Sequence, residues 1–157
     1  MTTGEDAHYE AFFKEQFSKV ARTAALVMGD VHDGMDVAQE AMARAYQHWR
    51  RVSAMDRPDA WVHKVATNIA LSRLRRRRPG QLATEPPTPP PDTRDDELLD
   101  AVRSLSPAQR SVIALRFFLD WSVEDVAQAL GKRPGTVRAL THQGMERLRS
   151  LLLEETP

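Results

Sequence analysis

Apolar residues recur at steps of three and four positions along most of the chain, and this spacing places them on one face of an α-helix. The longest such stretch, residues 6–28, includes Phe12, Phe13 and Phe17, which we expect to lie in the core. Similar stripes predict helices over residues 35–50, 58–78 and 98–105. The apolar–polar alternation of a β-strand is found nowhere in the sequence. The pattern therefore predicts an all-α protein.

Turn-forming residues divide the first half of the chain into three helices. Gly29 predicts the end of the first helix, because glycine readily adopts the left-handed conformation of a C-cap, and residues 30–34 form a polar turn. Residues 51–57 form a second connector, and Pro58 suits the first turn of the next helix. The polar residues predicted to lie off the apolar stripe of that helix are His63, Lys64, Thr67, Asn68, Ser72 and Arg75.

Residues 79–97 separate the two halves of the chain. Six prolines occur between Pro79 and Pro91, and few residues of this segment are apolar. Such a composition is typical of a semi-extended linker with polyproline II character, which at about 3 Å per residue could span roughly 40–60 Å. We therefore expect two small helical domains, residues 6–78 and 98–153, that need not touch each other.

The second half contains a predicted helix-turn-helix. Within residues 121–149, Ser122 and Asp125 have capping-box spacing, Gly131 suits the end of a first helix and Pro134 suits the start of a second. Side chains able to bind phosphate groups or base edges occur just before the second helix, at Arg133, and along it, at Thr136, Arg138, His142, Gln143 and Arg147. Such a helix fits the major groove of DNA. An ordinary helical hairpin with a solvated polar face is the alternative.

A second capping box precedes the helix-turn-helix. Ser106 and Gln109 have the required spacing, with Pro107 at the first helical position. The apolar run that follows includes Phe117 and Phe118 and is expected to be mostly buried.

Charge is distributed unevenly, although the formal net charge of the chain is zero. Residues 1–78 carry 13 basic and 10 acidic side chains, residues 79–97 carry 1 and 5, and residues 98–157 carry 8 and 7. Two mildly basic parts therefore flank an acidic connector.

The end of the helix expected over residues 58–78 is strongly basic. It carries five arginines: Arg73, Arg75, Arg76, Arg77 and Arg78. One or two cations suit the dipole of a helix C-terminus, but five would repel one another unless a polyanion lay nearby. We expect nucleic acid there, with Lys64 and Asn68 of the same helix able to meet phosphate and adenine. A solvated helix end is the alternative.

Several kinds of chemistry are missing from the sequence. No cysteine is present, which excludes disulfides and cysteine-bound zinc in this chain. The five histidines are scattered, no Gly-rich phosphate loop occurs, and Ser106 and Ser122 are better explained as helix caps than as nucleophiles. We therefore expect no enzyme activity, no cofactor and no metal site. Without an apolar run of about 18 residues or an apolar signal core, we expect a cytoplasmic protein with no membrane span.

The chain resembles the sigma factors of bacterial RNA polymerase, specifically the compact extracytoplasmic-function (ECF) group that keeps two conserved domains. Four stretches in order carry the resemblance: GDVHDGMDVAQEAMARAYQHW, RPDAWVHKVATNIALSRLRRRR, LSPAQRSVIALRFFLDWSVEDVAQALG and RPGTVRALTHQGMERLR. They are most similar to an actinobacterial, SigE-like subgroup. The resemblance implies a region 2 helical bundle and a region 4 helix-turn-helix that direct promoter-specific initiation. The partners it implies are core RNA polymerase and promoter DNA, and it leaves open whether an anti-sigma factor binds.

The resemblance also assigns roles to individual residues. Asp36, Gln39 and Glu40 match a D-x-x-Q-E motif that docks on the largest polymerase subunit in the family. Residues near 51–59 match a pocket for a flipped base, and Asn68 matches an asparagine of the helix that reads the minus-ten element. The other minus-ten contacts we expect are Lys64, Arg75, Arg76, Arg77 and Arg78. The helix-turn-helix would read the minus-thirty-five element.

The second helix of the helix-turn-helix departs from the family pattern. Leu140 and Gln143 stand where relatives carry basic or polar-basic residues, and their effect on upstream recognition cannot be derived from the sequence. A stand-alone helix-turn-helix regulator, whose N-terminal domain binds an effector or a partner protein, is the alternative function. An enzyme acting on nucleic acid is a third hypothesis and lacks metal ligands.

Overall fold

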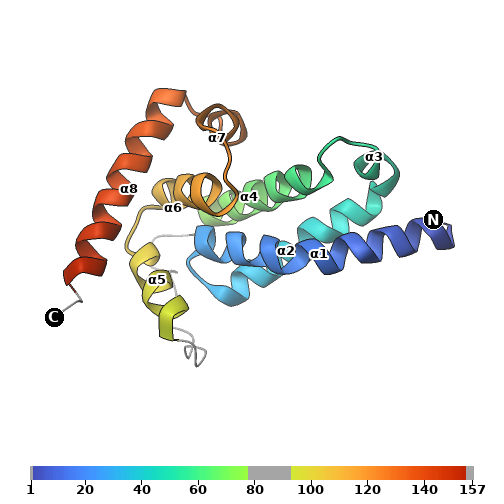
Figure 1. Cartoon of the computed structure of the whole chain (residues 1–157), viewed down its shortest axis with the longest axis horizontal. Helices are drawn as coiled ribbons and strands as arrows, with labels where there is room; N and C mark the ends of the chain where they lie inside the picture. The colour runs from blue at the N-terminus through green and yellow to red at the C-terminus, as the bar shows by residue number, and fades with distance from the viewer. Residues whose placement is uncertain (1, 78–92, 155–157) are drawn as a thin grey trace.

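The protein is entirely helical in the residues that its computed structural model describes, 2–77 and 93–154 (Figure 1). The helices are α1 (Thr3–Met28), α2 (Val31–Gln47), α3 (Trp49–Ser53), α4 (Pro58–Arg76), α5 (Thr93–Arg103), α6 (Pro107–Ile113), the π-helix η1 (Ala114–Phe118), α7 (Val123–Leu130) and α8 (Pro134–Glu154). The prediction of an all-α fold is confirmed. No helix in these two ranges is long and apolar enough to cross a membrane.

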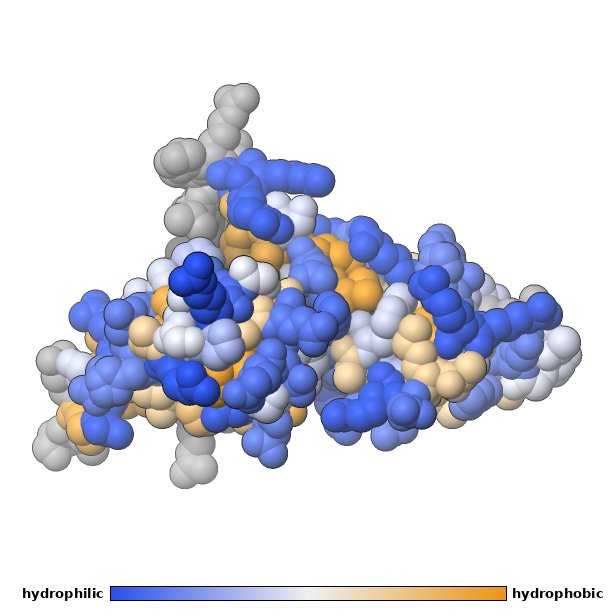
Figure 2. All heavy atoms as spheres, turned by 90° about the horizontal axis from the view of Figure 1, so that it is seen from above, coloured by the Kyte–Doolittle hydropathy of each residue, from blue (hydrophilic) through white to orange (hydrophobic). Residues whose placement is uncertain are grey.

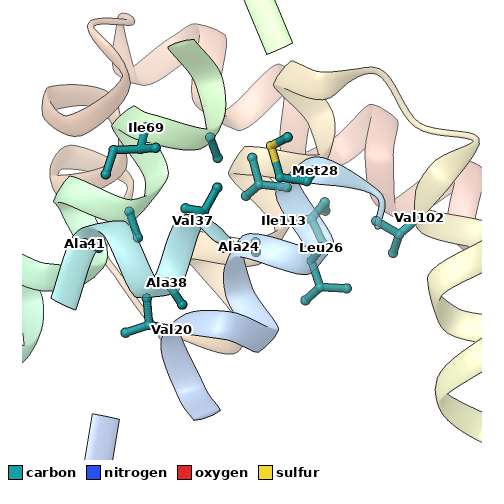
Figure 3. Close-up of a cluster of buried hydrophobic side chains, with 14 of the residues drawn as sticks. Val20, Ala24, Leu26, Met28, Val37, Ala38, Ala41, Ile69, Val102 and Ile113 are labelled. Carbon is teal, nitrogen blue, oxygen red and sulfur yellow. The ribbon is translucent and has the colours of Figure 1, made fainter. Parts of the chain in front are cut away.

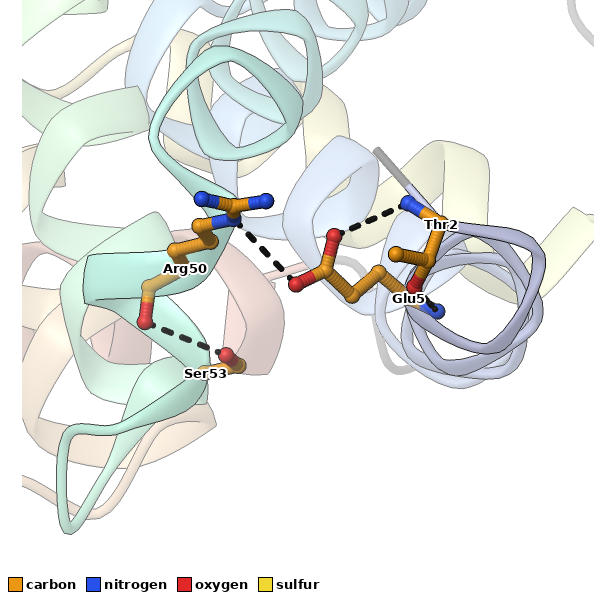
Figure 4. Close-up of polar contacts among 4 residues, drawn as sticks. All are labelled: Thr2, Glu5, Arg50 and Ser53. Atoms are coloured by element: carbon orange, nitrogen blue, oxygen red, sulfur yellow. Dashed lines mark hydrogen bonds and ion pairs between the residues drawn. The ribbon is translucent and has the colours of Figure 1, made fainter.

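The first helix is capped at both ends by local bonds. The side chain of Thr2 accepts from the backbone of Glu5, and Glu5 accepts from the backbone N–H of Thr2 at 3.0 Å, which completes a capping box. That second bond lowers the pKa of the Glu5 carboxyl below its usual value. Glu5 also accepts from Arg50 at 3.2 Å, so the start of α1 is tied to α3, where Ser53 donates to the carbonyl of Arg50 (Figure 4). Gly29 ends α1 in the left-handed conformation, with φ +75°.

The second helix begins earlier than predicted. Residues 31–34 belong to α2 rather than to a turn, because Asp30 acts as the N-cap and accepts from the backbone of Asp33 at 2.9 Å. Gly34 lies where α2 crosses α1. A Cβ atom added there would lie 2.5 Å from the backbone nitrogen of Ala25, so only glycine allows this close approach of the two helices.

One hydrophobic core joins the two halves of the chain. Val20, Val37 and Ile69 bring α1, α2 and α4 into this cluster, and Val102 and Ile113 enter it from α5 and α6 (Figure 3). The second half therefore packs against one end of the helices of the first half, at the end of α1 away from the N-terminus (Figure 1). The sequence did not predict whether the two halves would touch.

A smaller second core holds the helix-turn-helix together. It consists of Val112, Leu115, Val126, Ala127 and Val137, all buried. These residues come from α6, η1, α7 and α8, so the pair formed by α7 and α8 is anchored on the helix before it.

Two expectations about the segments between these cores need correction. Residues 79–92 of the expected linker and Arg78 lie outside the described residues, but α5 begins at Thr93, so residues 93–97 are helical rather than part of a linker. Pro91 is the last proline of the segment, and nothing after it prevents a helix. Phe117 and Phe118, expected to be mostly buried, are 52% and 38% exposed, because η1 lies at the surface of the second core.

On the face shown in Figure 2, hydrophilic residues predominate and apolar residues form separate patches. Arg22 lies over the ring of Phe118, 5.7 Å from its centroid, and so covers part of one exposed aromatic side chain.

The prediction that His63 and Thr67 lie off the apolar stripe of α4 is wrong. Both are buried, because α4 packs against α1 as well as α2 and so buries more than one narrow stripe. Thr67 donates its hydroxyl to the backbone carbonyl of His63 at 2.9 Å. Burial lowers the pKa of His63 to about 4; Asp59 opposes this shift, while Lys19 adds to it.

The buried His63 predicts a fall in stability at mildly acidic pH. Its pKa is about 4 in the folded chain and about 6.5 when unfolded, so the unfolded chain binds the proton more readily between these values. The free energy of unfolding should therefore fall as pH drops from about 6.5 to about 4, by up to about 3 kcal/mol from this group. Urea unfolding at a series of pH values measures this change.

Two histidine variants separate this effect from other titrating groups. His63→Phe cannot ionise and should flatten the profile between pH 6.5 and 4. His32→Phe, at an exposed position of α2, should leave the profile unchanged. An equally steep fall in His63→Phe would show that another group is responsible.

Candidate functional site

The helix-turn-helix has the predicted turn. The hydroxyl of Ser122 accepts from the backbone of Asp125 at 3.0 Å, which is the first of the two bonds of a capping box. Gly131 ends α7 in the left-handed conformation, with φ +64°, and Pro134 is the first residue of α8. The turn thus sets α8 at a fixed angle to α7.

The polar side of α8 is open to solvent. All six residues predicted to contact the upstream DNA element are exposed: Arg133, Thr136, Arg138, His142, Gln143 and Arg147. Val137 and Leu148 lie buried on the opposite side of the helix. Arg138 also lies 3.6 Å from Glu124 of α7, and both side chains remain largely exposed. The helix therefore presents a row of cationic, hydroxyl and amide donors on a rigid support.

The two atypical residues of α8 differ in their surroundings. Leu140 is partly buried and packs against the second core. Gln143 is exposed beside His142. The position of Leu140 is thus explained by packing, whereas Gln143 lies on the face that would meet a ligand.

The polar residues of α4 form a second candidate surface. Lys64 and Asn68 are exposed and lie one helical turn apart, and Arg75 and Arg76 are exposed near the end of the same helix. Arg77 is partly buried and donates to Asp33 of α2 at 2.5 Å. The predicted contact Arg78 lies outside the described residues.

The D-x-x-Q-E residues lie on α2. Asp36 and Gln39 are exposed, and Glu40 is partly buried. Glu40 accepts from Arg44 at 2.8 Å, as its spacing predicted, and from Arg73 of α4 at 2.5 Å. Because α2 begins at Val31, Asp36 lies beyond the first helical turn, so the helix dipole does not account for it.

A groove beside α4 is lined by residues of both halves of the chain. Its volume is about 280 Å³, and it runs between α4, α6 and α7. Residues lining it include Leu71, Leu74, Arg75, Pro107, Leu130 and Lys132. The second half therefore lies against the end of α4 that carries the arginines, and Arg75 shares one surface with Lys132.

Sequence reasoning missed a buried arginine at the contact between the halves. Arg110 of α6 is 6% exposed, and its Nε atom has no hydrogen-bond partner in the described residues. Burial lowers the pKa of Arg110, as do the neighbouring Arg77 and Arg103, and Arg103 donates to the carbonyl of Gly29 at 2.6 Å. The guanidinium of Arg110 lies directly against Gly29.

One signal in the sequence could have placed Arg110. It precedes Ile113 and Ala114 by three and four residues, which puts all three on one face of the helix. Ile113 and Ala114 belong to the core shared by both halves.

These surfaces can bind a polyanion at two places and a second partner at a third. The exposed donors on α4 and α8 suit phosphate groups and base edges, whereas α2 presents acidic and amide groups. Among the described residues, no three His, Asp or Glu side chains come together as metal ligands.

Comparison with known proteins gives consistent matches in both halves. Residues 12–79 match the family model described as Sigma-70 region 2, and residues 95–148 match Sigma-70, region 4. The RNA polymerase sigma-E factor of Streptomyces coelicolor is 31% identical, over 96% of this chain and 89% of that protein. The ECF RNA polymerase sigma factor SigL of Mycobacterium tuberculosis is 32% identical, over 96% of this chain and 92% of its own length.

A solved structure shares the fold. The sigma factor RpoE, in its co-crystal structure with the anti-sigma factor NepR from Bartonella quintana, aligns with a TM-score of 0.73. The alignment covers 94% of this chain and 98% of that one, at 18% identity. This likeness concerns the helical fold.

The different surroundings of Leu140 and Gln143 predict different effects on stability. Leu140→Ala removes apolar atoms from the edge of the second core and should lower the free energy of unfolding by about 2 kcal/mol. Gln143→Ala alters an exposed position and should change it by less than about 0.5 kcal/mol. Chemical denaturation measures both. Equal losses in the two variants would contradict the packing role of Leu140.

Proposed function

The chain belongs to the extracytoplasmic-function group of RNA polymerase sigma factors, and on that basis we propose which of its surfaces bind polymerase and promoter DNA. Such factors are not enzymes; they bind core RNA polymerase and promoter DNA to begin transcription. The observation that carries the assignment is the exposure of cationic and amide side chains on α4 and α8, together with the exposed Asp36 and Gln39 of α2. The chain works in the cytoplasm, where both partners are found.

The upstream element is read by α8. Its exposed donors lie on the side opposite Val137 and Leu148, so the helix can enter a major groove while its apolar side stays packed. Arg138 and Gln143 can reach base edges, since arginine pairs with guanine and glutamine with adenine. Arg133 and Arg147 lie near the ends of this row and suit phosphate groups.

The minus-ten element is read by α4. Asn68 has the amide donor and acceptor that adenine requires, and Lys64, Arg75 and Arg76 supply cations on the same helix. Residues 51–59 contain the end of α3 and the connector before Pro58, and we assign to them the pocket for a flipped base.

Core polymerase is bound through α2. Asp36 and Gln39 are exposed on one side of this helix, and its other side, with Val37 and Ala41, lies in the shared core. The exposed carboxylate of Asp36 and amide of Gln39 suit cationic and hydrogen-bonding groups on the partner.

The two halves must separate on a promoter. The two elements are centred about 25 base pairs apart, which is about 85 Å along B-DNA. In the described structure α4 packs near α6 and α6 packs on α8, so at 8–10 Å per helix pair the two reading helices lie only about 20 Å apart. The packed arrangement is therefore that of the free factor, and an anti-sigma factor that bound both halves would preserve it.

Transcription with purified components tests the proposed function. Adding the chain to core polymerase should give specific start sites on genomic DNA fragments, and the chain should co-purify with the polymerase. A stand-alone regulator would instead retard promoter DNA in a gel without polymerase. Retardation by the full-length chain alone, with no specific start sites in its presence, would reject the sigma-factor assignment.

Separation of the halves can be measured by energy transfer. The chain has no cysteine, so Ser18→Cys on α1 and Ser150→Cys on α8, both exposed, provide two specific dye sites. Transfer between the dyes should fall when core polymerase is added, because α8 moves away from α1. A pair within the first half, Ser18→Cys and Gln47→Cys, should show no change. Unchanged transfer in both pairs would contradict the opening.

A further inference from the structure

The arginines at the end of α4 are divided between two directions. Arg73 and Arg77 lie one helical turn apart and face α2, where each is paired at 2.5 Å, with Glu40 and Asp33 respectively. Arg75 and Arg76 are exposed to solvent. The run therefore does not act as a single cationic patch.

The two ion pairs brace one helix against the other. Asp33 precedes Glu40 on α2, whereas its partner Arg77 follows Arg73 on α4, so the helices run in opposite directions and are joined at two levels. All four side chains are partly buried, which reduces the screening of these pairs by salt. The brace fixes the register of α2 relative to α4.

Each oxygen of the Glu40 carboxylate already accepts a hydrogen bond from an arginine. Arg44 binds one of its oxygens and Arg73 binds the other. In the described residues the side chains of Asp36 and Gln39 form no hydrogen bond or ion pair, and both residues are exposed. A cation of a binding partner would therefore meet at Glu40 a charge already offset by two arginines, whereas the charge of Asp36 is not offset by an ion pair in the described residues.

We propose that Arg73 and Arg77 are positioning residues that hold the polymerase-docking helix α2 on the promoter-reading helix α4. Glu40 then supports polymerase binding through Arg73, and Asp36 and Gln39 make the direct contacts. Arg75 and Arg76 carry the phosphate contacts of this helix end. The inference rests on the proposed function and refines the roles of residues within it.

A double-mutant cycle on polymerase affinity tests the brace. Glu40→Gln and Arg73→Gln should each weaken binding of the full-length chain to core polymerase by about 2- to 5-fold, the size expected for a partly exposed ion pair. The combined variant should be no weaker than either single variant, because both remove the same interaction. Asp36→Asn is the matched comparison. Combined with Arg73→Gln, it should lower the affinity for polymerase by the product of the two single-variant factors, because the two residues act independently.

The salt dependence of promoter binding by the holoenzyme tests the division of the arginines. Each phosphate contact contributes about 0.7–0.9 to the slope of log affinity against log salt. Arg75→Gln with Arg76→Gln should reduce this slope by up to about 1.8. Arg73→Gln with Arg77→Gln should leave the slope unchanged, although it lowers the thermal midpoint of the free chain.

Several outcomes would overturn the inference. If the losses of polymerase affinity in Glu40→Gln and Arg73→Gln multiplied in the combined variant, Glu40 would contact polymerase directly. An equal fall in slope for the two arginine pairs, or a fall for neither, would mean that the arginines are not divided in this way. A wild-type chain that forms holoenzyme and initiates at specific sites satisfies the proposed function in all of these cases, so the two failures can be told apart.

Discussion

The whole structure depends on the burial of residues 24–28, the last turn and a half of α1, on every side. Residues 24–28 are all buried, which a single packed face of a helix cannot achieve. Helix α1 contacts α2 and α4 of the first half and α5, α6 and η1 of the second. The close approach at Gly34 sets the first of these contacts, and the cap at Gly29 opens space for the second. Both halves therefore meet at one short piece of helix.

A chain with no net charge presents cationic surfaces because its charges are sorted in space. Asp33 and Glu40 form ion pairs with arginines of α4 at the partly buried contact between the two helices. The exposed donors of α8 and the outward arginines of α4 remain available to a polyanion. Long-range attraction of DNA by the whole molecule is therefore weak, and binding depends on these local surfaces.

Local sequence patterns predicted the helices and their caps well, but they did not predict the contacts between segments distant in the sequence. The caps at Ser106 and Ser122, the turn at Gly131 and the exposed side of α8 follow from spacing within a few residues. The burial of His63 depends on α1 packing against α4, a contact that no periodicity within α4 encodes. The apolar run of residues 24–28 did carry a signal, since a helix segment that is apolar all round needs a second partner.

The buried guanidinium of Arg110 has a consequence for how firmly the halves hold together. The guanidinium of Arg110 is buried beside the like charges of Arg77 and Arg103, and its Nε has no hydrogen-bond partner among the described residues. Burial therefore removes water from this charge without fully replacing the hydrogen bonds lost. When the two halves separate, water again hydrates the guanidinium of Arg110. This gain offsets part of the free energy that is lost by exposing apolar side chains. The contact between the halves is thereby weakened, as suits two parts that must stay folded together and yet come apart whenever a partner binds them separately.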